Sequence, residues 1–226
     1  MAHLDTPMKI FLDTSNVDEI RKRYYTGLID GVTTNPTLML REGRDPRVVI
    51  EEICDIFAAD ENASISAEVS GDDAEEMLEM AEIYREISPK VTIKVPCTVD
   101  GLLACKTLTE QGTTVNVTLI FNAAQAILAA KAGATYVSPF VGRLDDQSIA
   151  GLEVIRSISE LYCRHGVQTQ ILSASIREVH RAVRSWYNGA HICTLPLKVF
   201  DNMYNHILTD AGLDQFNKDW SELTNK

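Results

Sequence analysis

The chain has 226 residues, of which 45% are hydrophobic, and this composition suits one globular domain with a full core. Its formal net charge is −11 and no basic run stands out, which argues against a nucleic-acid partner or an anionic membrane surface. The five cysteines are scattered and form no Cys-x-x-Cys pair, so the sequence predicts a reduced cytoplasmic protein without a disulfide scaffold or a zinc site. No signal peptide and no membrane-spanning stretch are predicted.

Short runs rich in β-branched residues alternate with helical patterns along the chain. Helices are predicted, for example, at Asp72–Ile87, Ala123–Ala132 and Ile149–His165. Strict alternation implies a parallel sheet, and eight units in this length predict a (β/α)8 TIM barrel. A doubly wound open sheet is the alternative, although no Gly-x-Gly-x-x-Gly follows the first strand. The predicted strands are Lys9–Thr14, Gly31–Asn35, Ser64–Val69, Val91–Pro96, Thr113–Ile120, Thr135–Val141, Thr169–Ser175 and His191–Pro196.

We expect a single barrel domain over residues 8–226, preceded by a flexible leader at Met1–Pro7. An extra amphipathic helix is predicted at Leu213–Leu223, beyond the eighth unit, because Phe216, Trp220 and Leu223 recur at helical spacing. This helix either closes the base of the barrel or packs on a neighbouring subunit.

Every second residue of the predicted strands is polar, whereas the residues between them are apolar. Because side chains alternate between the two faces of a strand, the apolar set faces the helices and the polar set lines the interior. The polar positions gather toward the carboxyl ends of the strands, where active sites of TIM barrels lie. The polar set is Thr33, Asn35, Ser64, Ser66, Glu68, Thr92, Lys94, Thr114, Asn116, Thr118, Ser173 and Ser175.

Lys94 lies inside the apolar strand Val91–Pro96. A buried ammonium is unfavourable unless it is paired or loses its proton, and a neutral amine in a dry pocket is a nucleophile toward carbonyl carbon. The alternative is a lysine that reaches from a strand end to a surface carboxylate.

Two carboxylates and two arginines are predicted at the same end of the barrel as Lys94. Asp13 ends the first strand, and Glu68 lies on the polar face of a neighbouring strand; a helix cap and a plain ion pair are their alternatives. Arg143 and Arg177 follow adjacent strands and could clamp a phosphate, or they could be surface arginines bonded to helix carboxylates. It is less plausible that all of these residues have separate structural roles than that they form one shared site.

Six motifs in this order resemble those of the transaldolase family, and the resemblance covers nearly the whole chain. The length is similar to that of the short transaldolases, a group that includes fructose-6-phosphate aldolase. The motifs are Leu-Asp-Thr-Ser at 12–15, Gly-Val-Thr-Thr-Asn-Pro-Thr at 31–37, Ile-Lys-Val-Pro at 93–96, Asn-Val-Thr-Leu-Ile-Phe at 116–121, Val-Ser-Pro-Phe-Val-Gly-Arg at 137–143 and Ser-Ala-Ser-Ile-Arg at 173–177.

The resemblance implies catalytic roles for four residues. Lys94 matches the lysine that forms the Schiff base, and Asp13 matches the acid/base that handles the C4 hydroxyl proton. Glu68 and Thr118 match the pair that holds the catalytic water. Substrate contacts are implied for Thr33, Asn35, Asn116, Ser138 and Phe140, and phosphate contacts for Arg143, Ser175 and Arg177.

The implied function is transaldolase: transfer of dihydroxyacetone from sedoheptulose 7-phosphate to glyceraldehyde 3-phosphate in the pentose phosphate pathway. No metal and no cofactor are expected, because the iminium acts as the electron sink, and a homo-oligomer is expected from the resemblance. The alternative is fructose-6-phosphate aldolase, in which glutamine resembles the position of Glu68 and tyrosine that of Phe140. A non-catalytic sugar-phosphate-binding barrel is less consistent with retained Lys94 and Asp13.

Overall fold

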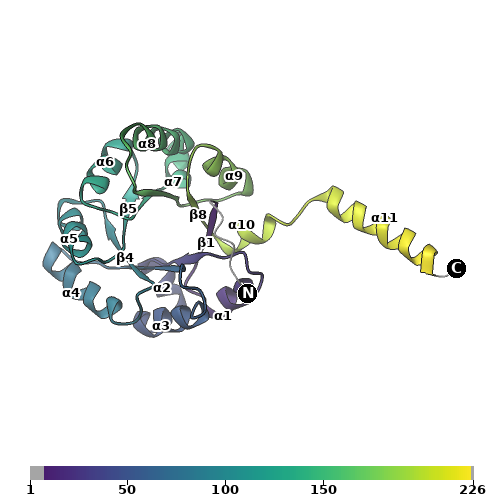
Figure 1. Cartoon of the computed structure of the whole chain (residues 1–226), viewed down its shortest axis with the longest axis horizontal. Coiled ribbons are helices and arrows are strands. Elements are labelled where there is room, and N and C mark those ends of the chain that lie inside the picture. The colour runs from purple at the N-terminus through teal and green to yellow at the C-terminus, as the bar shows by residue number, and fades with distance from the viewer. Residues whose placement is uncertain (1–7, 225–226) are drawn as a thin grey trace.

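The computed structural model describes residues 8–224 and confirms the predicted (β/α)8 TIM barrel (Figure 1). All strands of the barrel are parallel; each pairs with the next in chain order, and the last pairs with the first. The leader expected at Met1–Pro7 lies outside the described residues. The strands are β1 (Lys9–Asp13), β2 (Gly31–Thr33), β3 (Ser64–Glu68), β4 (Val91–Pro96), β5 (Val115–Ile120), β6 (Tyr136–Pro139), β7 (Gln170–Ser173) and β8 (Ile192–Leu195).

Helices surround the barrel, and two of them instead of one separate β2 from β3 and β6 from β7. Among the helices of residues 8–224, none is long and apolar enough to cross a membrane. The helices are α1 (Val17–Tyr24), α2 (Pro36–Glu42), α3 (Pro46–Ile56), α4 (Ala74–Arg85), α5 (Val99–Glu110), α6 (Ala123–Lys131), α7 (Val141–Asp146), α8 (Gly151–His165), α9 (Val179–Tyr187), α10 (Leu197–Asn202) and α11 (Ile207–Thr224).

The main hydrophobic core lies between the strands and the ring of helices. The apolar residues that alternate with the polar ones, such as Ile65, Ile93 and Val117, are fully buried in it, as strand alternation predicts. Each large aliphatic side chain removed from water in this way contributes roughly 1.5–3 kcal/mol. This layer fixes which face of each strand points into the barrel.

The interior of the barrel has a polar half on β2–β5 and an apolar half on β6–β8 and β1. The apolar half is a separate cluster in which Phe11, Leu172 and Ile192 pack with Tyr136. The prediction that Ser173 lines the interior is therefore wrong. Leu172 takes the inner face of β7, and the Ser173 hydroxyl lies 2.9 Å from that of Ser185 on α9.

Gly31 at the start of β2 makes room for this apolar half. A Cβ at this position would lie 2.3 Å from the carbonyl oxygen of Ser64 and 2.8 Å from the ring of Phe11. Any side chain would thus displace either the neighbouring strand or the aromatic ring. The glycine lets β2 approach β3 closely while Phe11 fills the barrel.

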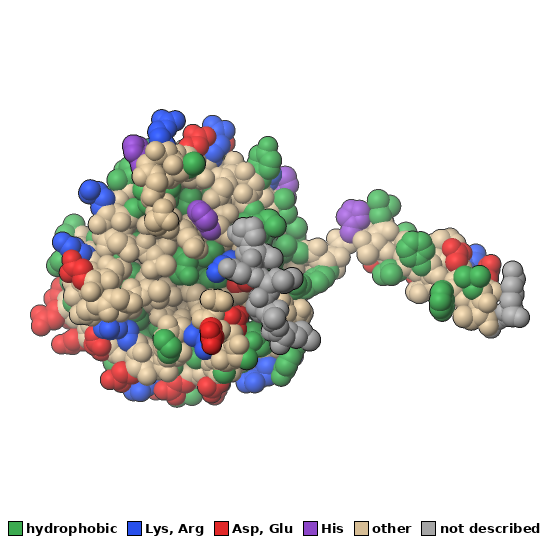
Figure 2. All heavy atoms as spheres, viewed as in Figure 1, with side chains coloured by type: hydrophobic (Ala, Val, Ile, Leu, Met, Phe, Trp, Pro, Cys, Tyr) green, Lys and Arg blue, Asp and Glu red, His purple; other side chains and the backbone are tan. Residues whose placement is uncertain are grey.

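The C-terminal helix α11 begins at Ile207, earlier than predicted, and projects away from the barrel (Figure 1). It does not close the base of the barrel, so that alternative is wrong. Figure 2 shows its apolar side chains in the open, and they include Leu213, Phe216 and Trp220, which are all more than half exposed. The apolar stripe was correctly read as helical, but it packs against nothing in residues 8–224.

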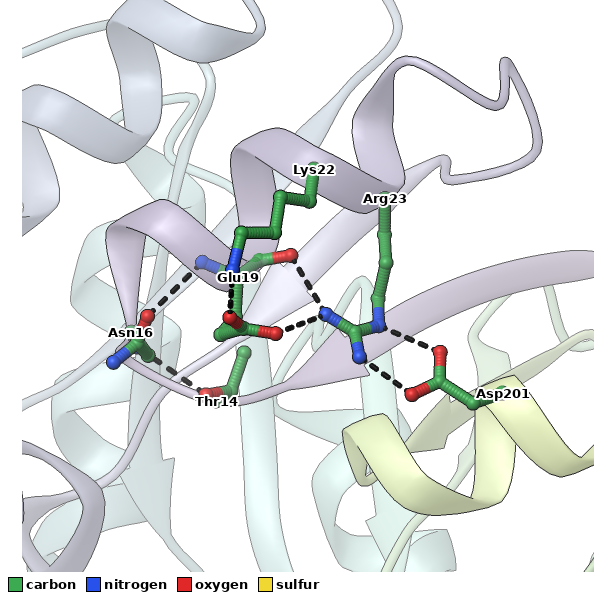
Figure 3. Close-up of polar contacts among 6 residues, drawn as sticks. All are labelled: Thr14, Asn16, Glu19, Lys22, Arg23 and Asp201. Atoms are coloured by element: carbon green, nitrogen blue, oxygen red, sulfur yellow. Dashed lines mark hydrogen bonds and ion pairs between the residues drawn. The ribbon is translucent and has the colours of Figure 1, made fainter.

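The preceding helix α10 is held to α1 by a charged network (Figure 3). The guanidinium of Arg23 donates to both carboxylate oxygens of Asp201, at 2.8 and 2.5 Å, and to Glu19 at 2.6 Å. Asn16 caps α1 by accepting the Glu19 N–H and donates its own N–H to Thr14 beside the end of β1. The chain therefore leaves the barrel from an anchored element.

Candidate active site

The centre of the site is an ion pair between Lys94 on β4 and Glu68 on β3. These residues are register partners on adjacent strands, and Lys94 Nζ lies 2.7 Å from Glu68 Oε2. The Lys94 side chain is 5% exposed and that of Glu68 is 16% exposed, so the pair is largely withdrawn from water. Nζ also donates to the carbonyl oxygen of Thr34 at 3.1 Å. The amine is thus held in place beside a carboxylate that can exchange protons with it.

Asp13 lies across the barrel interior at the end of β1, facing the same cavity. Its Oδ1 accepts a hydrogen bond from Thr33 Oγ1 at 2.8 Å. Desolvation by the surrounding protein raises the pKa of Asp13 above its ordinary value, while the charge of Lys94 and the Thr33 hydroxyl oppose that rise. A carboxyl with a raised pKa is suited to both taking and returning a proton near neutral pH.

Three hydrogen-bonded polar side chains lie beside Lys94 and centre on Asn116. Asn116 on β5 is the register partner of Lys94. Its side-chain oxygen accepts from Ser138 Oγ at 2.7 Å, and its amide nitrogen donates to Ser66 Oγ at 3.3 Å. These contacts fix the amide orientation, because oxygen and nitrogen each have a matching partner.

Thr118 is buried on the same strand, and its hydroxyl has no hydrogen-bond partner among the residues that the structure describes. Strand alternation puts it on the face of Asn116, one step nearer the carboxyl end. The pairing of β5 with β6 is irregular after Val117, and Leu119 adopts a left-handed φ of 58°. An unpartnered buried hydroxyl is a place for a water molecule or a ligand.

A cavity of about 110 Å³ joins Lys94 to Asp13. Glu68 faces a neighbouring hollow of about 370 Å³, and Asn35 lines both spaces. Asn35 caps α2 with its side-chain oxygen, which accepts the Leu38 N–H, so its amide group remains available to the cavity. The cavity is lined by Asp13, Thr33, Asn35, Lys94, Ser138, Phe140, Arg143, Leu172, Ala174, Ser175 and Thr194.

The two predicted phosphate-binding arginines are not in the same place. Arg143 lines the cavity and its guanidinium lies 4.8 Å from the centre of the Phe140 ring. Arg177 lies in an adjoining hollow of about 190 Å³, where it pairs with Asp146 at 2.5 Å. Ser175, with a left-handed φ of 59°, lines both spaces. The structure therefore places Arg143 in the same cavity as Lys94 and Arg177 in the adjoining hollow.

Gly142 on α7 explains why Arg177 can lie so close to the cavity. A Cβ there would be 2.1 Å from the Ser175 carbonyl oxygen and 2.8 Å from Arg177 Nε. Without a side chain at this position, the backbone of α7 approaches the end of β7, and Arg177 can extend along it.

Sequence reasoning missed Thr194 and Leu172, which both line the cavity. Thr194 is a buried residue on β8, and its Oγ1 lies 2.6 Å from Thr33 Oγ1. The signal that could have found it is the alternation of Ile192 and Thr194 with Cys193 and Leu195. Leu172 had no such signal, because its neighbour on the outer face is also apolar.

Comparison with known proteins gives consistent results at the level of sequence and of fold. The family described as Transaldolase/Fructose-6-phosphate aldolase matches residues 10–226. A protein of Paracoccus denitrificans named "probable transaldolase" is 51% identical over 219 residues, covering 97% of this chain and 99% of that protein. A protein of Alkaliphilus metalliredigens with the same name is 50% identical over 216 residues, covering 96% of this chain and 99% of that protein.

The solved structure of a thiamine phosphate pyrophosphorylase from Pyrococcus furiosus matches with a TM-score of 0.58. It covers 84% of this chain and 86% of its own, at 15% sequence identity. At that identity, the likeness shows the barrel fold alone.

Proposed function

The chain belongs to the transaldolase/fructose-6-phosphate aldolase family, and we propose that it is a transaldolase of the pentose phosphate pathway. It transfers a dihydroxyacetone unit from sedoheptulose 7-phosphate to glyceraldehyde 3-phosphate, giving erythrose 4-phosphate and fructose 6-phosphate. The observation that carries the proposal is the buried amine of Lys94, 2.7 Å from Glu68, in a site that also contains Asp13.

In the first step, the neutral amine of Lys94 attacks the C2 carbonyl of the ketose and forms a carbinolamine. Glu68 takes the proton that the Lys94 nitrogen loses as the carbinolamine forms and returns a proton to the departing hydroxyl, so water leaves and an iminium forms. The 2.7 Å contact and the unpartnered hydroxyl of Thr118 support this role, because together they offer a proton acceptor and a place for the water.

In the second step, Asp13 removes the proton of the C4 hydroxyl. The C3–C4 bond breaks, its electrons move into the iminium, and the aldose leaves with a new carbonyl group. The remaining three-carbon enamine attacks the carbonyl carbon of the next aldose phosphate, and Asp13 returns its proton to the new hydroxyl. Water finally hydrolyses the iminium on Lys94 and releases the product ketose.

The cavity offers groups for the hydroxyls and for the phosphate of the substrate. Ser138 and Asn116 hold one another at 2.7 Å beside Lys94, where the dihydroxyacetone moiety is attached. Arg143 and Ser175 line the same cavity as Lys94. Arg177 completes the phosphate site when it exchanges Asp146 for the phosphate, because both are anions suited to a guanidinium.

Fructose-6-phosphate aldolase is the second candidate. Glu68 and Phe140 favour transaldolase, because a carboxylate at position 68 and the absence of a phenol at position 140 make protonation of the enamine slower than its attack on an aldehyde. A cytoplasmic location and a homo-oligomer belong to the same proposal; the scattered cysteines support the first and the exposed apolar face of α11 supports the second.

One reaction mixture tests the proposal. Fructose 6-phosphate is incubated with and without erythrose 4-phosphate as the acceptor, and sedoheptulose 7-phosphate, glyceraldehyde 3-phosphate and free dihydroxyacetone are measured together. We expect rapid acceptor-dependent transfer with little dihydroxyacetone, and borohydride should trap a reduced three-carbon fragment on Lys94. Strong acceptor-independent release would favour the aldolase, and an adduct mapped to any other lysine would contradict the assignment of Lys94.

A further inference from the structure

Thr194 is a buried polar side chain of the cavity, and the proposed mechanism assigns it no role. We infer that Thr194 is a positioning residue: it holds the hydroxyl of Thr33 in the orientation that serves Asp13. The inference rests on the proposed function, because it assigns a role within the acid/base step.

The topology places Thr194 and Thr33 on the two strands that flank β1. Thr33 is the register partner of Asp13 on one side, and Thr194 is the register partner of Phe11 on the other. Their hydroxyl oxygens approach to 2.6 Å across the inner face of β1, and both residues are buried. Branching at Cβ restricts the χ1 angles of both threonines, so the contact defines their orientation closely.

The number of hydroxyl hydrogens determines which group donates in each hydrogen bond from Thr194 through Thr33 to Asp13. Thr33 has a single hydroxyl hydrogen, and it donates this hydrogen to Asp13 Oδ1 at 2.8 Å. An ionised carboxylate only accepts, so Thr33 has no hydrogen left for its contact with Thr194. Thr194 must therefore be the donor at 2.6 Å when Asp13 is ionised. A donor to Thr33 polarises its hydroxyl and strengthens the bond to the carboxylate.

The same three groups can remain hydrogen-bonded when Asp13 is protonated. Once Asp13 has taken the substrate proton, its carboxyl can donate to Thr33, which can then donate to Thr194. Each hydroxyl exchanges its donor and acceptor roles without a heavy atom moving. Valine at position 194 could fill the same volume but could neither donate nor accept.

The charged groups around Asp13 are Lys94 on β4, Glu68 on β3 and Arg143, which lines the same cavity. Among residues 8–224, the Thr194 hydroxyl is hydrogen-bonded to Thr33 and to none of these charged side chains. A change at Thr194 therefore acts on Asp13 through Thr33 and leaves the Lys94–Glu68 pair intact. This separation makes the inference testable without disturbing formation of the Schiff base.

The test compares Thr194→Val with Thr194→Ser, and uses Thr92→Val as a matched control. Thr92 is an equally buried threonine of the barrel interior. Its hydroxyl oxygen lies 2.8 Å from Ser64 Oγ, and it has no hydrogen bond to Asp13 or Thr33 among the described residues. Thr194→Val should lower kcat about tenfold, the rate equivalent of one hydrogen bond, with KM within about twofold. The acid limb of the kcat–pH profile should move to higher pH, because the ionised carboxylate loses support. Thr194→Ser should restore both values, and Thr92→Val should leave the acid limb in place.

A second readout does not depend on activity. The carboxyl of Asp13, labelled with ¹³C, is titrated by NMR in the unmutated protein and in Thr194→Val. A higher midpoint in the variant supports the inference, and an unchanged midpoint with an unchanged acid limb overturns it. Equal losses in the serine and valine variants would show that packing, not the hydroxyl, matters. If the unmutated protein neither cleaves nor transfers sugar phosphates, the proposed function fails, while the titration still decides the role of Thr194.

Discussion

Replacing Glu68 with glutamine removes one charge from the buried pair with Lys94 at nearly constant volume. The two groups lie 2.7 Å apart, and at an effective dielectric constant of about 20 their gross attraction is roughly 6 kcal/mol. Desolvation offsets much of that attraction, and removal of one partner from a buried pair costs about 3–5 kcal/mol. Glutamine keeps an acceptor oxygen, so we expect the free energy of unfolding to fall by about 3 kcal/mol.

The same substitution should change the partition of the enamine intermediate. Glu68 handles the protons for forming and hydrolysing the iminium, so Glu68→Gln should reduce the rate of transfer by about 10²–10⁴-fold. A carboxylate at position 68 keeps protonation of the enamine slow, so its loss should let the enamine be protonated more often before it attacks an acceptor. Release of free dihydroxyacetone should therefore rise relative to transfer.

Urea unfolding measures the first effect, and a combined assay of dihydroxyacetone and sedoheptulose 7-phosphate, formed from fructose 6-phosphate and erythrose 4-phosphate, measures the second. Glu52→Gln is a matched control, because Glu52 pairs with Arg44 at 2.6 Å while both side chains are more than a third exposed. An exposed pair of this kind contributes about 0–1 kcal/mol, and its loss should leave the partition unchanged. If Glu68→Gln matches this control in both measurements, the reasoning about Lys94 and Glu68 is wrong.

Three further outcomes are expected. Asp13→Asn should abolish activity yet raise the free energy of unfolding at pH 7. The pKa of Asp13 is raised in the folded state, so keeping this carboxyl ionised opposes folding. In urea unfolding measured against pH, the stability gain should vanish below pH 3.8, where Asp13 is protonated in both the folded and the unfolded state. Arg177→Ala should raise KM for phosphorylated donors by about thirtyfold and leave unphosphorylated dihydroxyacetone unaffected, whereas equal losses would indicate a structural role. Ending the chain at His206 should reduce the number of chains per particle in light scattering, and an unchanged number would exclude α11 from assembly.

Strand alternation was enough to predict how Glu68 and Lys94 meet. Both were assigned to the polar face of neighbouring parallel strands near their carboxyl ends, and the register makes them direct partners. The same logic assigned Asp13 and Asn116 to the inner face, and the structure places Asp13 in the cavity of Lys94 and Asn116 as the register partner of Lys94. These positions are set by backbone geometry, which a hydrophobic pattern encodes directly.

Where the pattern was ambiguous, the prediction failed. On β7 both faces are apolar, since Ile171 lies in the outer core and Leu172 in the inner cluster, so hydropathy could not identify the inner face, and Ser173 was misplaced. Arg177 forms an ion pair with Asp146 at the end of α7, and no periodicity of the sequence encodes such a side-chain contact. The stripe of α11 predicts a helix but contains no information on what covers it.

The division of the barrel interior explains how one site can contain an amine and a carboxyl with different requirements. The polar half supplies Glu68, which compensates the charge of Lys94. The apolar half includes Phe11 on the same strand as Asp13, and burial raises the pKa of Asp13. Asp13 lies where the two halves meet. It is hydrogen-bonded to Thr33 on β2, which contacts Thr194 on β8, whereas Lys94 is paired with Glu68 on β3. The acid/base step and the Schiff-base step can therefore be altered independently, by substitutions on different strands.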